Sequence, residues 1–324
     1  MKNKVILIIG GTGALGKTLI KRYYKDNTII VFSRDEHKHY HLQKEYPKVT
    51  SIVGNIREKD SVMNALVKCN PQVVINAAAL KHVPICEDNP YESVKTNIIG
   101  HQNVIECVSL YRRPASNSKI ETLIFVSTDK ACKPINVYGM CKAISEQLYI
   151  SFAKQEPVTK VVLVRYGNVL ESTGSVIPFF KNLLLSDETT YLPITDMNMT
   201  RFLLSLDSAV TLIDNAYRDE NSHGKIAIPK VKSLKVTDVA KNLIDWMRPE
   251  MVIDLKEIGI RDGEKLHEEM ISSEEWTYTS DEGYAYLIGH YQLRQPDGWS
   301  YNSKDSLMHP SECKQFLIDN GVLM

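Results

Sequence analysis

The sequence lacks an excess of either charge, because its 324 residues include 39 lysine and arginine side chains against 39 aspartate and glutamate side chains. A chain without net charge has no long-range field that would attract nucleic acid or an anionic membrane. No apolar run approaches the roughly 18 residues of a membrane-spanning helix. The first residues also enter a short strand-like run instead of a secretory signal. We therefore expect a soluble, cytoplasmic protein with no nucleic-acid or membrane partner.

The sequence also has little that would bind metal or form disulfides. Its six cysteines contain no Cys-x-x-Cys pair and are scattered among apolar residues. This pattern predicts reduced, mostly buried thiols and no metal site. A histidine-rich tract at residues 37–41 leaves a metal-binding alternative open, beside its interpretation as the solvated start of a helix.

A glycine-rich loop follows the first apolar run. Residues 5–9 are continuously apolar, as in an inner strand of a parallel sheet, and the sequence GGTGALG follows them at residues 10–16. Its glycines fit a variant of the dinucleotide fingerprint, in which backbone amides and a helix start approach a pyrophosphate. Residues 11–18 also fit the triphosphate-binding pattern GxxxxGK[ST]. The candidate cofactor contacts in this loop are Gly10, Thr12, Gly13, Ala14, Leu15 and Gly16.

The second apolar run distinguishes between these two motifs. Residues 28–32 end in Ser33 and Arg34, about 20 residues past the glycines, where a dinucleotide fold contacts the adenosine ribose. A guanidinium can bind a 2′-phosphate through two hydrogen bonds. The sequence therefore predicts NADP rather than NAD, with Ser33, Arg34 and Lys38 as phosphate contacts. A triphosphate enzyme needs a magnesium-binding Asp after an apolar strand, and Asp129 keeps that alternative open.

Strand and helix patterns continue to alternate through the first half of the chain. Strands are expected at residues 49–53, 73–75, 123–127 and 161–164, and helices at 58–69, 91–111 and 138–153. This alternation predicts an α/β fold, a doubly wound parallel sheet of the Rossmann type with its ligand crevice at the carboxyl ends of the strands. The residues expected there beside the cofactor are Asn55, Ile56, Ala77, Ala78 and Ala79.

Beyond residue 168 the alternation loosens, and no linker separates a second unit. Residues 172–175 and the helical pattern at 176–185 suggest a lid, and another helix is expected to begin within residues 261–269. We expect residues 1–168 with about 200–229 to form the cofactor domain, and residues 169–199 with 230–324 to form a smaller, intertwined substrate domain. Loops that carry Arg201 and Arg261 would suit a phosphate-bearing substrate, and ordinary solvated loops are the alternative.

The stretch at residues 126–142 brings several reactive groups together after an apolar strand. It contains the hydroxyl of Thr128, the carboxylate of Asp129 and the amine of Lys130, followed by Tyr138 and Lys142 one helical turn apart. An ammonium beside a phenol favours the phenolate, so Tyr138 is a candidate base. A Tyr-x-x-x-Lys pair alone is more typical of an ordinary exposed helix than of a catalytic site, but its position after a strand end favours a catalytic pair if the glycine-rich loop holds a hydride cofactor.

Six segments together resemble the extended short-chain dehydrogenases/reductases: GGTGALG, NAAALKHVPICEDNP, KTNIIG, STDKACKPINVYGMCK, RYGNV and RDGEKLHEEM. They are most similar to the UDP-N-acetylglucosamine 4,6-dehydratases that also invert carbon 5. The resemblance implies that Thr128, Tyr138 and Lys142 act on the oxygen of carbon 4, and that Asp129 and Lys130 act at carbons 5 and 6. The substrate contacts expected in this family are Lys81, Asn97, Asn168, Ser175, Val176, Arg201, Arg261, Glu264 and Glu269.

The resemblance also implies a reaction and a partner. Carbon 4 of UDP-N-acetylglucosamine would be oxidised by a tightly held NADP, water would leave across carbons 5 and 6, and hydride would return to carbon 6. A homo-oligomer, dimer or hexamer, would pair the helices at residues 91–111 and 138–153. The alternatives are a UDP-hexose 4-epimerase or reductase of the same superfamily, a P-loop triphosphatase, and a regulator that binds NADP without turnover.

Overall fold

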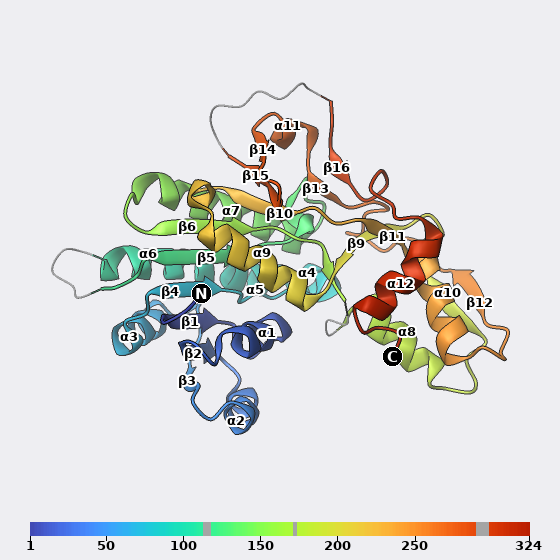
Figure 1. Cartoon of the computed structure of the whole chain (residues 1–324), viewed down its shortest axis with the longest axis horizontal. Helices are drawn as coiled ribbons and strands as arrows, with labels where there is room; N and C mark the ends of the chain where they lie inside the picture. Colours follow the sequence, from blue (N-terminus) through green and yellow to red (C-terminus); the bar gives the residue numbers. More distant parts are fainter. Residues whose placement is uncertain (113–117, 171–173, 290–297) are drawn as a thin grey trace.

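The large sheet sets the architecture of the chain, whose residues 1–112, 118–170, 174–289 and 298–324 are described by a computed structural model. In this described part, nine strands follow the order β14-β15-β10-β6-β5-β4-β1-β2-β3 (Figure 1). The order from β3 to β6 is that of a doubly wound sheet, which confirms the predicted fold class. Within this large sheet, the strands that pair in parallel are β1 (Val5–Ile9), β2 (Thr28–Ser33), β3 (Thr50–Val53), β4 (Val73–Asn76), β5 (Thr122–Val126), β6 (Lys160–Val164) and β10 (Ile226–Pro229).

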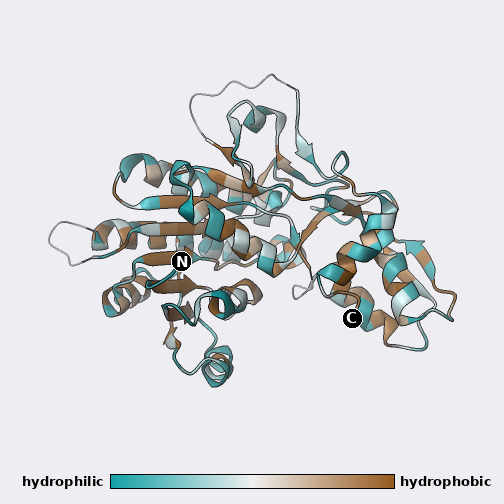
Figure 2. Ribbon diagram, in the orientation of Figure 1, coloured by the Kyte–Doolittle hydropathy of each residue, from teal (hydrophilic) through white to brown (hydrophobic). Residues whose placement is uncertain are grey.

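Helices cover both faces of this sheet. On one face α1 (Ala14–Tyr23) packs against α9 (Leu206–Arg218), and their apolar sides join one core with the strands. On the other face α3 (Lys59–Cys69), α6 (Gly100–Tyr111) and α7 (Val137–Gln155) close a second core. Figure 2 shows the apolar strands between the more polar helices. Because both faces are covered, the inner strands are continuously apolar, which is why they could be predicted from the sequence.

The helix predicted at residues 91–111 is interrupted. After α4 (Val83–Asp88), the chain forms α5 (Pro90–Val94), then a π-helical turn at Lys95–Ile99, and then α6. The turn contains Asn97. Its side chain accepts a hydrogen bond from the backbone amide of Leu80 at 2.9 Å and donates one to the backbone carbonyl of Leu80 at 2.8 Å. This contact with another segment lies at the point where the helical geometry changes.

A smaller lobe has a third core of its own. It contains α8 (Val176–Leu184), β8 (Tyr191–Ile194), α10 (Val236–Met247), β12 (Asp254–Glu257) and α12 (Pro310–Asp319). In Figure 1 these elements lie together at the right, with the carboxyl terminus. The sheet β11-β9-β7, formed by Ser233–Lys235, Thr200–Leu204 and Asn168–Val169, contributes to this core as well. The serine and threonine of the expected lid, residues 172 and 173, lie outside the described residues.

The segment at residues 261–269 begins with a turn, in which the amide of Glu264 donates to the carbonyl of Arg261 at 3.1 Å, and then runs extended, so the helix predicted there is wrong. Gly263 has a φ of +78°, and the amide of Thr200 donates to the carbonyl of Leu266 at 3.1 Å. The chain then enters β13 (Glu269–Ile271), which pairs with β16 (Tyr301–Asn302). Pairing with distant strands therefore overrides the local helical spacing of these residues.

Residues 279–288, which the sequence analysis assigns to the substrate domain, extend the large sheet. After α11 (Ser273–Trp276), β14 (Thr279–Asp281) pairs antiparallel with β15 (Ala285–Ile288), and β15 pairs with β10. The antiparallel hairpin adds an edge that βα alternation does not predict.

The histidine tract lies on α2 (Glu36–Glu45), which Asp35 caps by accepting from the amide of Lys38. His39 points inward and contacts Ser33 and Ser51, and no group of three or more metal-binding side chains occurs in the described ranges. The cysteines are free and all but Cys69 are buried, as predicted. Among the helices of the described residues, none has the length and apolarity to span a bilayer.

Candidate active site

The predicted site residues converge at one edge of the large sheet. Strands β1, β4, β5 and β6 pair in parallel, so their carboxyl ends point the same way. Gly10, Ala77 and Ser127 follow three of these ends directly. The glycine-rich loop and the stretch at residues 126–142 therefore share an edge, as the sequence predicts.

The glycine-rich loop forms a cradle without side chains. Gly10 has a φ of +81°, and a Cβ there would lie 2.8 Å from the amide nitrogen of Ala78. Gly13 is the N-cap of α1 and provides no side-chain cap, so the first amides of the helix remain available. Helix amides beside a close backbone approach bind phosphate well. The loop therefore fits a dinucleotide pyrophosphate, with Ala14, Leu15 and Gly16 in the first turn of the helix.

The end of β2 presents the groups predicted for the adenosine ribose. The hydroxyls of Thr12 and Ser33 lie 2.9 Å apart, and the buried ring of His39 lies 2.9 Å from Ser33 Oγ. Arg34 is exposed and forms no ion pair within the described residues, whereas Lys38 pairs with Asp35 at 3.1 Å. Arg34 is therefore the more available of the two cations for a 2′-phosphate.

The remaining cofactor candidates line the neighbouring strand ends. Asn55 accepts a hydrogen bond from the amide of Arg57 at 3.1 Å, and Ile56 is buried where a Cβ on Gly100 would collide with it. Ala77, Ala78 and Ala79 are half-buried after β4. Their small side chains leave space for a ligand beside the backbone.

Gly139 explains why the start of α7 lies against the loop that follows β5. A Cβ on Gly139 would overlap the carbonyl oxygen of Lys130. Asn136 caps the helix by accepting from the amide of Gly139 at 2.7 Å, and its amide group donates to the carbonyl of Gly263 at 2.7 Å. The Tyr138 segment, the Lys130 loop and the 261–269 segment are therefore held together.

Hydrogen bonds join the side chains of Thr128, Asp129 and Lys130. The Thr128 hydroxyl donates to Asp129 Oδ1 at 2.9 Å, and the Lys130 ammonium donates to the same oxygen at 3.1 Å. Burial raises the pKa of the Asp129 carboxyl, against the opposing effect of Lys130. Burial would lower the pKa of Lys130, but Asp129 and Glu268 outweigh it and raise that pKa above its ordinary value. Both raised pKa values favour the protonated forms, which are a carboxylic acid at Asp129 and an ammonium at Lys130.

Tyr138 and Lys142 lie one turn apart on α7, but no contact joins them in the described part of the chain. Burial raises the pKa of Tyr138, and the Asp129 carboxyl adds to that effect. The Lys142 ammonium instead donates to the carbonyl of Val126 at 2.5 Å. Burial lowers the pKa of Lys142 to about 7. The expectation that Lys142 depresses the pKa of Tyr138 is therefore wrong for the protein alone.

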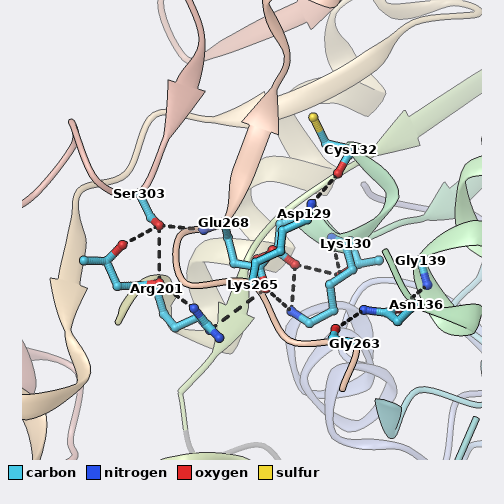
Figure 3. A network of polar contacts seen from close by, with 12 residues as sticks. Asp129, Lys130, Cys132, Asn136, Gly139, Arg201, Gly263, Lys265, Glu268 and Ser303 are labelled. Atoms are coloured by element: carbon cyan, nitrogen blue, oxygen red, sulfur yellow. Dashed lines mark hydrogen bonds and ion pairs between the residues drawn. The ribbon is translucent and has the colours of Figure 1, made fainter. Parts of the chain in front are cut away.

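Glu268 is a site residue that the sequence analysis missed. Its Oε1 lies 3.3 Å from Lys130 Nζ, and its side chain is only 3% exposed (Figure 3). The sequence predicts a helix here, with Glu264 and Glu269 as the acidic substrate contacts. In an extended segment, successive side chains point to opposite faces, which places Glu268 inward and its neighbour outward. Strand-like alternation was therefore the available signal.

Several predicted substrate-binding residues have buried polar atoms without a hydrogen-bond partner in the described residues. Within the described residues, Asn168 Oδ1, Ser175 Oγ and Glu264 Oε2 are buried without a hydrogen-bond partner. Such atoms are normally paired in folded proteins, so a ligand is a suitable partner for them. Ser175 is the N-cap of α8, and Val176 is its first residue. The structure thus keeps these four residues as substrate candidates.

The other predicted substrate-binding residues differ in burial and in the partners that they already have. Arg201 is buried in β9 and lies 4.0 Å from Glu268 Oε1. Lys81 and Arg261 are exposed, and Glu269 pairs with Lys133 at 3.7 Å. The side chain of Asn97, bonded to Leu80 and Ser93, supports the loop before Lys81. We therefore assign Asn97 a supporting position, not an open ligand contact.

Comparison with known proteins agrees with this arrangement. Residues 6–289 match the family model described as polysaccharide biosynthesis protein. The chain is 40% identical to the inverting UDP-N-acetylglucosamine 4,6-dehydratase of Campylobacter jejuni, over 98% of this chain and 97% of that protein. It is 36% identical to a UDP-glucose 4-epimerase of Rickettsia felis, over 88% of this chain and 83% of that protein.

A solved structure of similar length supports the same assignment. The X-ray structure of Pen from Bacillus thuringiensis superposes with a TM-score of 0.88 at 31% identity, over 99% of both chains. The resemblance to extended short-chain dehydrogenases/reductases drawn from the six sequence segments is thereby confirmed. The chain belongs to the polysaccharide biosynthesis protein family.

Proposed function

We propose that the protein is a nicotinamide-dependent UDP-N-acetylglucosamine 4,6-dehydratase that inverts carbon 5. The observation that carries the proposal is the ion pair between the buried carboxyl of Asp129 and the ammonium of Lys130, whose side chain is 18% exposed, at the sheet edge that also holds the glycine-rich loop. An epimerase needs only oxidation and reduction at carbon 4, whereas elimination of water needs an acid and a base beside carbons 5 and 6. The dehydratase from Campylobacter jejuni supports the same function by its similarity over nearly the full chain.

The proposed roles follow from the chemistry of each side chain. A bound nicotinamide cofactor supplies the acceptor for the hydride of carbon 4 and its later donor to carbon 6. Tyr138 removes the proton of the carbon 4 hydroxyl, and Thr128 orients that oxygen. The resulting ketone acidifies the hydrogen on carbon 5, which Lys130 removes as a neutral amine. Asp129 donates its proton to the hydroxyl of carbon 6, which leaves as water.

We propose NADP as the cofactor. Arg34 is exposed beside Ser33 and free of ion pairs within the described residues, so it is available to bind a 2′-phosphate. Structures of the same fold from Streptomyces venezuelae and Thermus thermophilus contain NAD, which supports a nicotinamide dinucleotide as the cofactor class.

We propose that the smaller lobe covers the nucleotide part of the substrate. Arg201 and the 261–269 segment lie on the lobe side of the Asp129 and Lys130 pair, and Asn168 and Ser175 keep open polar atoms. Residues 1–168 with about 200–229 would bind the cofactor, and residues 169–199 with 230–324 would bind uridine diphosphate, apart from the hairpin that joins the large sheet.

We also propose a cytoplasmic homo-oligomer. A groove of about 440 Å³ runs between α6 and α7 and is lined by Ile105, Leu110, Leu148 and Phe152 with polar neighbours. Met140 and Ile144, which precede Leu148 by successive turns of α7, are 48% and 47% exposed. Paired helices of two subunits would cover this apolar stripe.

Incubation with UDP-N-acetylglucosamine in deuterated water, without added cofactor, tests the proposal. We expect a product that has lost one water and carries deuterium on carbon 5, measured by mass and proton spectra. A product that keeps all its oxygen would identify a 4-epimerase or reductase instead. Cofactor binding without turnover would indicate a regulator, and magnesium-dependent phosphate release would indicate a triphosphatase.

The Lys130→Ala variant separates the two halves of the reaction. We expect it to abolish water loss while oxidation at carbon 4 still produces reduced cofactor, visible by its absorbance in a single turnover. Unchanged water loss in this variant would remove Lys130 from the mechanism.

A further inference from the structure

Lys130 lies between two buried carboxylates that belong to distant parts of the chain. Its ammonium is 3.1 Å from Asp129 Oδ1 and 3.3 Å from Glu268 Oε1 (Figure 3). The other oxygens, Asp129 Oδ2 and Glu268 Oε2, are buried and have no partner within the described residues. One ammonium therefore faces two acids, and each acid has one free oxygen.

The charges around the two acids differ. Glu268 faces the cations Lys130, Arg201 at 4.0 Å and Lys265, whose ammonium donates to the carbonyl of Cys132 at 2.7 Å. Among the described residues, the only cation in an ion pair with Asp129 is Lys130, and the phenol of Tyr138 and the negative charge of Glu268 also act on it. Two adjacent buried carboxyls cannot both ionise at low cost, so the group with more cations takes the charge.

The backbone holds Glu268 in this position independently of Lys130. The amide of Glu268 donates to Ser303 Oγ at 2.8 Å, and its carbonyl accepts from the amide of Ser303 at 2.8 Å. Ser303 Oγ also lies 2.7 Å from Thr200 Oγ1. A side chain anchored on both sides of its own backbone is suited to a positioning role.

We propose that Glu268 is a positioning residue for elimination: as the ionised partner of Lys130, it leaves Asp129 as the carboxylic acid and accepts the proton that Lys130 must lose. This inference rests on the proposed dehydratase function. Burial and the surrounding charges favour an ionised Glu268 beside a protonated Asp129 before the reaction, because the pKa of Glu268 is lowered by Lys130, Arg201 and Lys265 against burial, while burial raises the pKa of Asp129.

The proton count closes at every step. Transfer of one proton from the Lys130 ammonium to the Glu268 carboxylate gives an amine and a carboxylic acid, and it removes two opposite charges from a largely buried site. The Lys130 amine then takes the proton of carbon 5 and becomes an ammonium again. Asp129 gives its proton to the carbon 6 hydroxyl, which leaves as water, and Glu268 can return its proton when carbon 5 is reprotonated.

Tyr138 completes the cycle. As a phenolate, Tyr138 takes the proton of the carbon 4 hydroxyl and becomes a phenol, and after elimination Asp129 is a carboxylate within its electrostatic reach. Return of that proton to Asp129 restores both groups. Overall the substrate loses one water, and the protein neither gains nor loses a proton.

The first test measures protonation directly, in wild-type protein without substrate. With ¹³C-labelled aspartate and glutamate, we expect the Asp129 carboxyl to be protonated and the Glu268 carboxyl to be ionised at neutral pH. The two carbon signals are assigned by their loss in Asp129→Asn and Glu268→Asp. An ionised Asp129 beside a protonated Glu268 would overturn the proposal, whether or not any variant folds poorly.

The second test follows each half of the reaction in Glu268→Gln, with Glu274→Gln as the matched control. Glu274 also pairs with a lysine, Lys133 at 3.4 Å, but its side chain is 73% exposed. We expect Asp129 to become ionised in Glu268→Gln, because it is then the only acid paired with Lys130. The alkaline fall in the rate of water loss should therefore begin at a lower pH than in the wild type, and beyond that point the rate should drop about tenfold for each pH unit. Oxidation at carbon 4 should continue, and Glu268→Asp should recover part of the elimination.

The outcomes separate this inference from the proposed function. If the wild-type protein does not eliminate water from UDP-N-acetylglucosamine, the proposed function is refuted. The ¹³C signals of the two carboxyl groups still show which of them is protonated. If the wild type loses water and Glu268→Gln keeps the wild-type pH profile of elimination, the role of Glu268 is refuted while the function stands.

Discussion

The Lys142 ammonium is bound to the end of β5, where it donates to the carbonyl of Val126 at 2.5 Å and lies 4.0 Å above the ring of Phe125. Its side chain is fully buried, and its partners within the described residues do not include the hydroxyl of Tyr138. The predicted Tyr-x-x-x-Lys pair is therefore present in the fold, but the protein alone holds Lys142 away from the role that the spacing suggests.

Lys142→Met should change the pH dependence of stability in a defined direction. Burial lowers the pKa of Lys142 from 10.5 to about 7 in the folded protein. Between these values the unfolded chain binds a proton that the folded chain does not, so the free energy of unfolding contributed by this group rises with pH. Urea unfolding of both proteins between pH 7 and 10.5 should show the wild type gaining on the variant by at most about 1.4 kcal/mol per pH unit. If the free energies of unfolding of the two proteins changed in parallel with pH, the lowered pKa of Lys142 would be contradicted.

Gly10→Ala should destabilise the cofactor-free protein, whereas Gly13→Ala should not. Gly10 has a φ of +81°, and its added Cβ would meet backbone atoms of Ala77 and Ala78 that cannot move aside. The cost of such a conformation is about 1–3 kcal/mol before the collision is counted. Gly13 has an ordinary φ of −77°, and its Cβ would lie 3.4 Å from the carbonyl oxygen of Gly10. Thermal unfolding of the two variants measures the difference, and equal melting temperatures would refute the cradle geometry.

The parts of the site that the sequence predicts are those built by short segments. Gly10, Thr128 and Tyr138 each lie at a strand end or helix start that local periodicity identifies, and the parallel sheet brings these ends to one edge. Glu268 depends instead on strand pairing around Thr200 and Ser303, and the alternation of side chains along its own segment does not specify which strands it pairs with. The same long-range pairing explains why the helix expected at residues 261–269 does not form.

Arg165→Met should be one of the most destabilising substitutions outside the reacting groups. The Arg165 guanidinium is buried between Glu146 at 2.6 Å and Glu275 at 2.7 Å, and it also donates to the carbonyl of Met270. Removing the cation leaves two carboxylates without their partner, which costs about 3–5 kcal/mol. Chemical denaturation should show this loss.

Lys232→Met is the matched control for Arg165→Met. Lys232 also pairs with a carboxylate, Glu312 at 2.9 Å, but its side chain is 59% exposed. A surface pair contributes about 1 kcal/mol or less, so the unfolding free energy of this variant should stay close to that of the wild type. A similar loss in both variants would show that burial does not set the cost of breaking these pairs.

Arg34→Ala should weaken NADP binding more than Lys38→Ala does. Arg34 is exposed beside Ser33 without an ion pair in the described residues, whereas the Lys38 ammonium is already bound to Asp35 at 3.1 Å. Loss of a charge-assisted contact to the 2′-phosphate should raise the dissociation constant for NADP by about 10- to 100-fold and leave that for NAD nearly unchanged. Calorimetric titration with both cofactors checks this, and equal effects on NADP and NAD would place the phosphate elsewhere.

Ile144→Asp should dissociate the proposed oligomer, because a charge would be placed in the apolar stripe that a second copy would cover. Ile144 is 47% exposed on α7, one turn from Leu148 in the groove between α6 and α7. Val252, which is 91% exposed before β12 in the smaller lobe, provides the control Val252→Asp with the same change of charge. Light scattering after size-exclusion chromatography should give an oligomer for the wild type and the control, and a monomer for Ile144→Asp. An unchanged mass for Ile144→Asp would move the interface to another face, since a buried, unpaired carboxylate costs too much to be kept inside a subunit contact.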